Sequence, residues 1–421
     1  MSGEARVSEP ALTPVESPKR MHSLDALRGF VIAAMLFVNM TWNREVFPGQ
    51  FFHIAWNDPA QGATFTDLVF PWFVFIVGCA TPLSMRFGRG RSQSAPRRLL
   101  GAARRALVLY LLGVLLTVAG QVYTRPLVWT DLLSWNILQL IGLAYFATVC
   151  IYLLPRWAQI TFVVAVLLAK LATLIFIPWE VVEQAGLVRA AADAPAGPGT
   201  WAHFDGVKRL LHMEHAAGAG ALLLGWLGMA QQWLPLAAIA VVGGWLTEVL
   251  ASGRKELEKL QVVGGAGAAL LLGAYLLQWG YDGVGGGLLG PFTVPFSKWL
   301  ISPAYCLLSA GTGALLLVGC WWVIDAKAWT RLYPFIVYGR NAIALYFGAE
   351  FSFKVIWSKW QMPLPEGAAA KSDSLAGGFL AWVEAWTGSP AIAAWAFVIA
   401  WLVGWWVFCW WLDRRRIYIR V

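Results

Sequence analysis

The chain has 421 residues, of which 59% are hydrophobic and only 13% charged, and it contains 26 tryptophans. A soluble globular domain of this length does not need so much apolar surface, so the composition excludes an ordinary cytosolic fold and indicates a protein embedded in a bilayer. The net charge of +9 does not point to nucleic acid as a partner, because its largest contributor is one arginine-rich loop of the kind that lies on the cytoplasmic side of membrane proteins.

The N-terminal residues and the cysteines suggest neither a cleaved leader nor a metal centre. Residues 1–21 are polar, rich in Pro, Ser and Glu, and lack an apolar core, so we expect a disordered cytoplasmic tail rather than a signal peptide. Residues 22–421 are expected to form a single transmembrane domain. The five cysteines lie in apolar runs without metal-ligand spacing and are interpreted as small core residues: Cys79, Cys150, Cys306, Cys320 and Cys409.

Apolar segments of about 20 residues recur along the chain, which is the length an α-helix needs to cross the hydrocarbon core. Because a bilayer offers no water to backbone polar groups, helices are the expected spanning structure. We therefore predict an all-α, polytopic transmembrane helical bundle. Its ten predicted spans are 24–42, 66–86, 106–124, 132–154, 158–178, 235–252, 262–280, 302–324, 332–356 and 389–412.

The stretch 214–252 leaves an eleventh span open. It has nearly twice the length that one span requires and is interrupted by Gln231, Gln232 and Pro235. If 214–232 also crossed the membrane, the arginines of 413–416 would lie outside, against the positive-inside rule. We therefore expect ten spans, with 214–232 as an interfacial or re-entrant helix.

The loop after the second predicted helix determines the expected orientation. Residues 86–105 carry seven arginines and no acid, which predicts a cytoplasmic position. Both termini are then expected inside and the loop around His53 outside. The segments 179–213, 280–290 and 363–389 are expected to be outer loops.

The hairpin of the first two helices carries most of the polar residues that suggest chemistry. An ionisable or amide group at membrane depth is costly, so each needs a functional or structural reason. Histidine side chains ordinarily titrate near neutral pH, so His53 is a candidate general base or nucleophile, although a histidine at the interface can simply form a hydrogen bond. Asp67 follows Thr66 before an apolar run, so helix capping alone could explain it, but it could also hold the His53 imidazole in the tautomer that catalysis needs. Asn39 lies late in an apolar helix and needs a partner helix or a polar cavity. In a catalytic role it could donate a hydrogen bond to a developing oxyanion.

Basic residues near the helix ends are candidates for binding a phosphorylated cofactor. Arg340 and Asn341 open the ninth predicted helix at its cytoplasmic end, where a cytosolic cofactor first meets the protein. Glu350 and Lys354 are four residues apart on the same helix, and a purely structural ion pair is the alternative. Arg28 is three residues from an acid, so it too could serve a local ion pair.

The following segments, in this order, resemble the heparan-α-glucosaminide N-acetyltransferase family and its bacterial relatives: SLDALRGFVIAAMLFVN, HIAWN, TDLVFPWFVFIVGCATPLS, NILQLIGLAYF, SKWLISPAYCLLSAG and VYGRNAIALYF. The resemblance implies an integral membrane acetyltransferase that takes acetyl from cytosolic acetyl-CoA and delivers it to an amino sugar or glycan across the membrane. The catalytic histidine of the family falls on His53, and Asn39, Asp67 and Asn341 match polar positions of its motifs.

The sequence differs from the family pattern at two places, and two alternative functions remain open. The family has Leu-Gln-Arg where this chain has a leucine at 140, and the acidic Asp-Pro-Glu segment is reduced to residues 204–206. A membrane O-acyltransferase of a surface polysaccharide or lipid-linked sugar is the alternative enzyme, and a transporter that binds no CoA is the alternative class. We expect a multi-pass protein of the plasma (inner) membrane, with no nucleic-acid partner and with a homodimer left open.

Overall fold

The computed structural model describes residues 21–56, 58, 61–87, 93–122, 126–127, 135–188, 197–213, 218–283, 286–329, 332–366 and 372–419. Within these ranges the chain is helical, and the extended pairing is limited to one isolated bridge between Gln361 and Ser374. The all-α prediction is confirmed for this part of the chain. The predicted disordered tail lies outside the described residues except for Met21.

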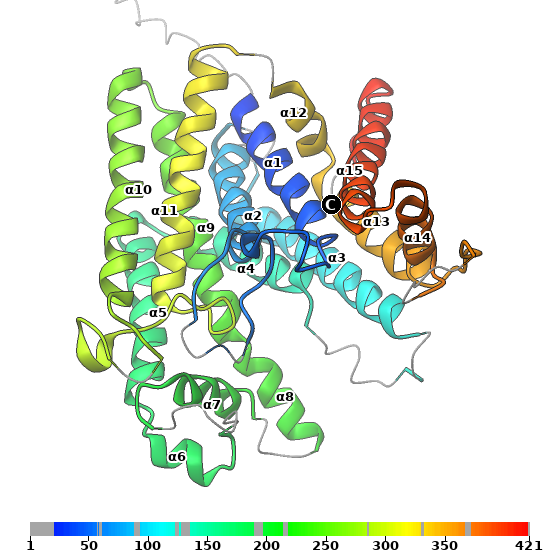
Figure 1. Ribbon diagram of the computed structural model, residues 1–421. Helices are drawn as coiled ribbons and strands as arrows, with labels where there is room; N and C mark the ends of the chain where they lie inside the picture. The colour runs from blue at the N-terminus through cyan, green and yellow to red at the C-terminus, as the bar shows by residue number, and fades with distance from the viewer. Residues whose placement is uncertain are drawn as a thin grey trace, which may run out of the picture.

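The α-helices, in chain order, are α1 (His22–Val38), α2 (Phe65–Pro82), α3 (Ala95–Gln121), α4 (Ile137–Tyr152), α5 (Arg156–Phe176), α6 (Trp179–Gln184), α7 (Trp201–Leu211), α8 (Ala219–Gly228), α9 (Ala230–Leu250), α10 (Glu256–Gln278), α11 (Pro303–Cys320), α12 (Tyr333–Arg340), α13 (Ala342–Ser352), α14 (Leu375–Thr387) and α15 (Pro390–Arg414). Short 3-10 or π-helical turns are η1 (Gly49–Phe51), η2 (Leu83–Phe87), η4 (Gly290–Phe292), η5 (Trp321–Ala326) and η7 (Phe353–Trp357). Figure 1 shows α1 and α2 in the middle of the bundle, with α10 and α11 on one side and α13, α14 and α15 on the other.

Seven helices in the described part of the chain are long and apolar enough to cross a membrane: Phe65–Met85, Ala95–Gln121, Arg156–Phe176, Ala219–Leu250, Glu256–Gln278, Pro303–Ala326 and Pro390–Arg414. The three other predicted spans fall short of this length. α1 has 17 residues, α4 has 16, and the predicted helix 332–356 is broken into α12 and α13 at Asn341. The count of ten or eleven spans is therefore not confirmed and stays a prediction.

The stretch 214–252 does not fold as the expected separate helices 214–232 and 235–252. α8 and α9 follow one another through Met229 and form one helical run from Ala219 to Leu250 (Figure 1). The expected break at Pro235 is absent, since that proline lies inside α9, as membrane helices tolerate. Residues 214–217 lie outside the described part.

Three predicted loops contain helices because local capping signals were overlooked. α3 begins at Ala95 with a proline in its first turn, so the last four arginines of the basic loop lie on that helix rather than before it. In the predicted outer loop 179–213, the Thr200 side chain caps α7 by accepting a hydrogen bond from the backbone N–H of His203. In the loop 363–389, Ser374 caps the start of α14 in the same way.

Glycines bring the backbones of α1 and α12 into direct contact. A Cβ atom built on Gly29 would lie 1.7 Å from the carbonyl oxygen of Phe335, and one built on Gly339 would lie 1.8 Å from that of Asp25. Small residues allow such close approach in membrane bundles, where dispersion contacts replace the hydrophobic effect between helices. The contact fixes the start of α1 beside the end of α12, and so places Arg28 near Arg340.

We expect Gly339→Ala to lower the thermal stability of the purified protein clearly. The added methyl group has no space against the α1 backbone, and overpacking of this kind typically costs about 1–3 kcal/mol or more. Gly404→Ala on α15 is the matched control, because nothing lies within 4 Å of its added Cβ atom. Thermal unfolding in detergent measures both variants, and equal melting temperatures would contradict the close α1–α12 contact.

Candidate functional site

His53 lies in the α1–α2 loop, which is tied to the helices by hydroxyl groups. The Thr41 hydroxyl donates to the carbonyl oxygen of Phe51 at 3.0 Å, and the Thr64 hydroxyl to that of Phe52 at 2.8 Å. Both acceptors immediately precede His53, so the backbone beside the imidazole is fixed from two sides. The His53 side chain itself is 42% exposed and therefore accessible to a substrate.

Asp67 is buried in the first turn of α2, with 1% of its side chain exposed. The N-cap residue is Thr64 rather than the expected Thr66, and Asp67 completes a capping box with it. One carboxylate oxygen, Oδ2, accepts from the backbone N–H groups of Thr64 at 3.2 Å and Ile54 at 3.3 Å. The other oxygen, Oδ1, lies 2.7 Å from Nδ1 of His53. Oδ2 therefore serves the cap of α2, whereas Oδ1 contacts the His53 imidazole.

The His53–Asp67 contact determines which imidazole nitrogen is available for chemistry. Because the carboxylate accepts a hydrogen bond, Nδ1 of the neutral ring carries the hydrogen and Nε2 keeps its lone pair. A carboxylate in this position also stabilises the imidazolium that forms when Nε2 takes up a proton. The pair has the geometry of a general base with its orienting acid.

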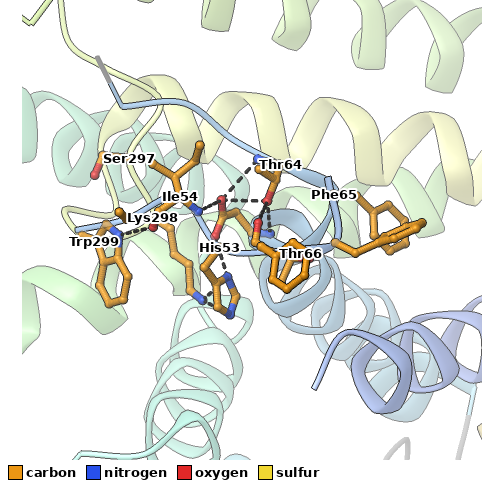
Figure 2. A network of polar contacts seen from close by, with 12 residues as sticks. His53, Ile54, Thr64, Phe65, Thr66, Ser297, Lys298 and Trp299 are labelled. Atoms are coloured by element: carbon orange, nitrogen blue, oxygen red, sulfur yellow. Dashed lines mark hydrogen bonds and ion pairs between the residues drawn. The ribbon is translucent and has the colours of Figure 1, made fainter. Parts of the chain in front are cut away.

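Lys298 completes this cluster and was missed in the sequence interpretation. It lies between η4 and α11, and its Nζ is 3.1 Å from both ring nitrogens of His53 (Figure 2). Burial lowers the pKa of Lys298 to about 8, although the Asp67 carboxylate acts in the opposite direction. The signal in the sequence is that Lys298 is the one charged residue between Asp282 and Asp325.

Asn39 is not part of this cluster. It caps the end of α1, and its Nδ2 donates to Oε1 of Glu350 on α13 at 2.6 Å. Among the described residues no hydrogen bond joins Asn39 to His53. The amide predicted to assist catalysis thus has the partner on another helix that its position in an apolar segment requires.

The predicted cofactor residues separate into two groups. Arg28 and Arg340 line one cavity of about 370 Å³, together with Arg105 of α3, which the sequence interpretation treated only as a topology signal. Arg28 is paired with Asp25 at 3.2 Å and Arg340 with Asp413 at 2.6 Å. The cavity also has hydroxyl groups from Thr81, Ser84, Tyr145 and Tyr418 on its wall.

Asn341 and Lys354 do not line this cavity. The Asn341 side chain is 1% exposed, donates to the carbonyl oxygen of Ile417 at 3.1 Å, and accepts from the N–H of Ile419 at 2.8 Å. It therefore holds the segment after α15. Lys354 follows the far end of α13, which rises about 16 Å over its length. The four residues predicted to bind the cofactor therefore do not line one common cavity.

A second histidine, His203 of α7, has a structural environment. Its Nδ1 accepts from the N–H of Gly199 at 3.1 Å, and its Nε2 lies 2.8 Å from the carbonyl oxygen of Ile177. Burial lowers the pKa of His203, whereas the bond to Ile177 acts in the opposite direction. Both nitrogens are used by backbone groups, so His203 offers no lone pair to a substrate.

Comparison with known proteins supports the family resemblance over part of the chain. Residues 20–188 match the family model described as heparan-alpha-glucosaminide N-acetyltransferase, catalytic. The chain is 36% identical over 137 residues to the heparan-alpha-glucosaminide N-acetyltransferase of Homo sapiens, and 35% identical over 130 residues to that of Mus musculus. These stretches cover 32% and 31% of this chain but only 20% and 19% of the relatives. The resemblance is confirmed for this region, which contains His53 and Asp67, and the chain spans about a fifth of the length of the curated relatives it matches.

We expect Asn341→Ala to release the segment after α15. The backbone groups of Ile417 and Ile419 lose their side-chain partners, so amide hydrogen exchange over 415–419 should become faster. Asn39→Ala removes an amide of the same kind at a site bonded to Glu350 and should leave exchange in that segment unchanged. Unchanged exchange in Asn341→Ala would show that Asn341 does not anchor this segment.

Proposed function

We propose that this chain is an integral membrane acetyltransferase that transfers acetyl from acetyl-CoA to an amino sugar or related glycan on the extracytoplasmic side of the plasma (inner) membrane. The observation that carries the proposal is the His53–Asp67 pair, which lies inside the region that matches the catalytic family model. A histidine whose Nε2 keeps its lone pair, with a buried acid behind Nδ1, suits acyl transfer, where a proton must leave the attacking group.

In the proposed reaction, Nε2 of His53 takes the proton of the acceptor amine while the amine nitrogen attacks the thioester carbon. The new C–N bond forms, the C–S bond breaks, and CoA leaves as a thiolate. In a covalent variant, Nε2 first attacks the thioester carbon, the C–S bond breaks and CoA leaves as a thiolate. The acceptor amine then attacks the acetyl carbon, the bond from that carbon to Nε2 breaks, and Nε2 takes up the amine proton. Both routes require the same unprotonated nitrogen, and in both Asp67 stabilises the positive charge that develops on the ring.

The arginine-lined cavity is the proposed site for the phosphates of the donor. Arg28, Arg105 and Arg340 bring three guanidinium groups to it, and guanidinium is well suited to phosphate oxygens. Arg28 and Arg340 are partly neutralised by carboxylates, whereas Arg105 bonds to the hydroxyl group of Tyr145 at 3.3 Å and has no ion pair within the described residues. Arg105 is therefore the guanidinium most available to a ligand.

Helix α2 connects the cavity to His53. The cavity wall reaches Phe73, which lies six residues after Asp67, so about 9 Å along the helix axis separates the two. We propose that the pantetheine arm of acetyl-CoA crosses this interval and presents the thioester to His53. Because the arginine-rich end is expected in the cytoplasm, the donor would enter from that side and the acceptor from the other.

His53→Ala is expected to reduce acetyl transfer about 10²–10⁴-fold without loss of the fold, because the ring is removed from a partly exposed loop position. Membranes from an overexpressing strain, supplied with radiolabelled acetyl-CoA and glucosamine or oligosaccharides that end in glucosamine, provide the assay. Asp67→Asn should give an intermediate rate, and His22→Ala, which removes an exposed histidine, should retain the wild-type rate.

Two results of this assay would contradict the proposal, and each concerns a different part of it. Equal rates for wild type and His53→Ala would overturn the catalytic assignment. If the wild type acetylates none of these acceptors but purified protein binds acetyl-CoA, the acceptor class is wrong and the donor assignment remains.

Arg105→Ala is expected to weaken acetyl-CoA binding about tenfold, which corresponds to the loss of one charge-assisted contact of ~1.4 kcal/mol. Arg104→Ala is the matched control, since it removes the same charge from the neighbouring position of α3 but does not line the cavity. Ligand-dependent thermal stabilisation measures both affinities. An equal change in the two variants would place the CoA phosphates elsewhere.

A further inference from the structure

The segment that carries Lys298 is fixed to the His53 loop on both sides of the lysine. The Ser297 hydroxyl donates to Oε1 of Gln61 at 3.1 Å, and the indole N–H of Trp299 donates to the carbonyl oxygen of Ile54 at 3.1 Å. Figure 2 shows Lys298 between these anchors with its side chain directed at the imidazole. The hydrogen bonds of Ser297 and Trp299 therefore fix the backbone on both sides of Lys298 and keep its amine next to His53.

The geometry of the amine relative to the ring is unusual for a simple hydrogen bond. Nζ is 3.1 Å from Nδ1 and also 3.1 Å from Nε2, so it faces the ring between the two nitrogens. It does not lie along the lone-pair direction of Nε2, which points away from the ring centre. Nε2 consequently remains open to a proton or an acyl carbon while the amine stays close.

The two charges beside His53 act in opposite directions: the Asp67 carboxylate favours the imidazolium, and the Lys298 ammonium disfavours it. The buried Asp67 carboxylate and a protonated Lys298 balance one another, so a proton on His53 would add a second cation 3.1 Å from the first. A like charge at such a distance disfavours protonation. Since burial lowers the pKa of Lys298 to about 8, the amine is still largely charged at neutral pH. Arg44, Glu45 and Asp58 are further charged residues in the described part of the same loop. None of them is changed in the variants compared below.

We propose that Lys298 is a positioning residue for His53, whose ammonium group disfavours protonation of the imidazole and so keeps Nε2 available as base or nucleophile at neutral pH. The inference rests on the proposed function in giving His53 a reactive role. The charge relation between the two side chains can be measured with neither acetyl-CoA nor an acceptor present.

Carbethoxylation by diethyl pyrocarbonate provides the measurement, because only the unprotonated imidazole reacts. The full-length purified protein is treated between pH 5 and 8, and modification of the His53 peptide is quantified by mass spectrometry. Lys298→Met should move the midpoint of the His53 profile upward by about one pH unit or more, as expected for removal of an adjacent cation. Lys298→Arg restores a permanent cation and should return the midpoint close to that of the wild type.

Two controls separate this effect from a general change. Lys327→Met removes an exposed lysine, 3.8 Å from Glu256, and should leave the His53 midpoint unchanged. The exposed His22 is a reference in every sample and should react alike in all variants. Thermal unfolding verifies that each variant is folded, and Lys298→Gln replaces Lys298→Met if the latter is not.

An unchanged His53 midpoint after loss of the Lys298 charge would overturn the proposal, as would Lys298→Arg behaving like Lys298→Met. Absence of acetyl transfer by the wild-type protein would count against the proposed function and not against this charge relation.

Discussion

The burial of the Asp67 carboxylate is the constraint on which the site depends. A charged group with almost no solvent contact is tolerated only when its oxygens have donors. Here the donors are Nδ1 of His53 and the backbone N–H groups of Ile54 and Thr64, all from the α1–α2 loop or its junction with α2. The same residue accepts a hydrogen bond at its carbonyl oxygen from the Tyr305 hydroxyl of α11. One residue thus joins the loop, α2 and α11.

Between the arginine-lined cavity and His53, α2 is packed into the apolar core. Phe70, Phe73 and Val74 are each at most 5% exposed. In the proposed reaction, an acyl group held against this part of α2 would meet few water molecules, and exclusion of water both limits hydrolysis and strengthens electrostatic interactions near the acyl group. The arrangement suits the proposed reaction, in which the charged part of the donor and the reacting carbon lie near opposite ends of α2.

The sequence predicted the features that depend on composition and on neighbouring residues. The helical membrane bundle follows from repeated apolar segments, and the His53–Asp67 pair involves residues only 14 apart, on either side of one helix start. Features that depend on tertiary proximity were not predictable. Lys298 lies 245 residues from His53, and Asn39 finds Glu350 at a separation of 311. The break at Asn341 was missed because the C-terminal segment that satisfies its amide lies far along the chain.

The site is built from two distant parts of the chain, which are joined by the contacts of Gln61 with Ser297 and of Ile54 with Trp299. The region that matches the family model ends at residue 188 and contains the histidine, its acid and the start of α2. It does not contain the lysine, the indole or the tyrosine that close the loop from the side of α11. A fragment that ended with that region would lack every one of these contacts, so the part of the chain that matches the family model depends on a later part to hold its histidine loop in place.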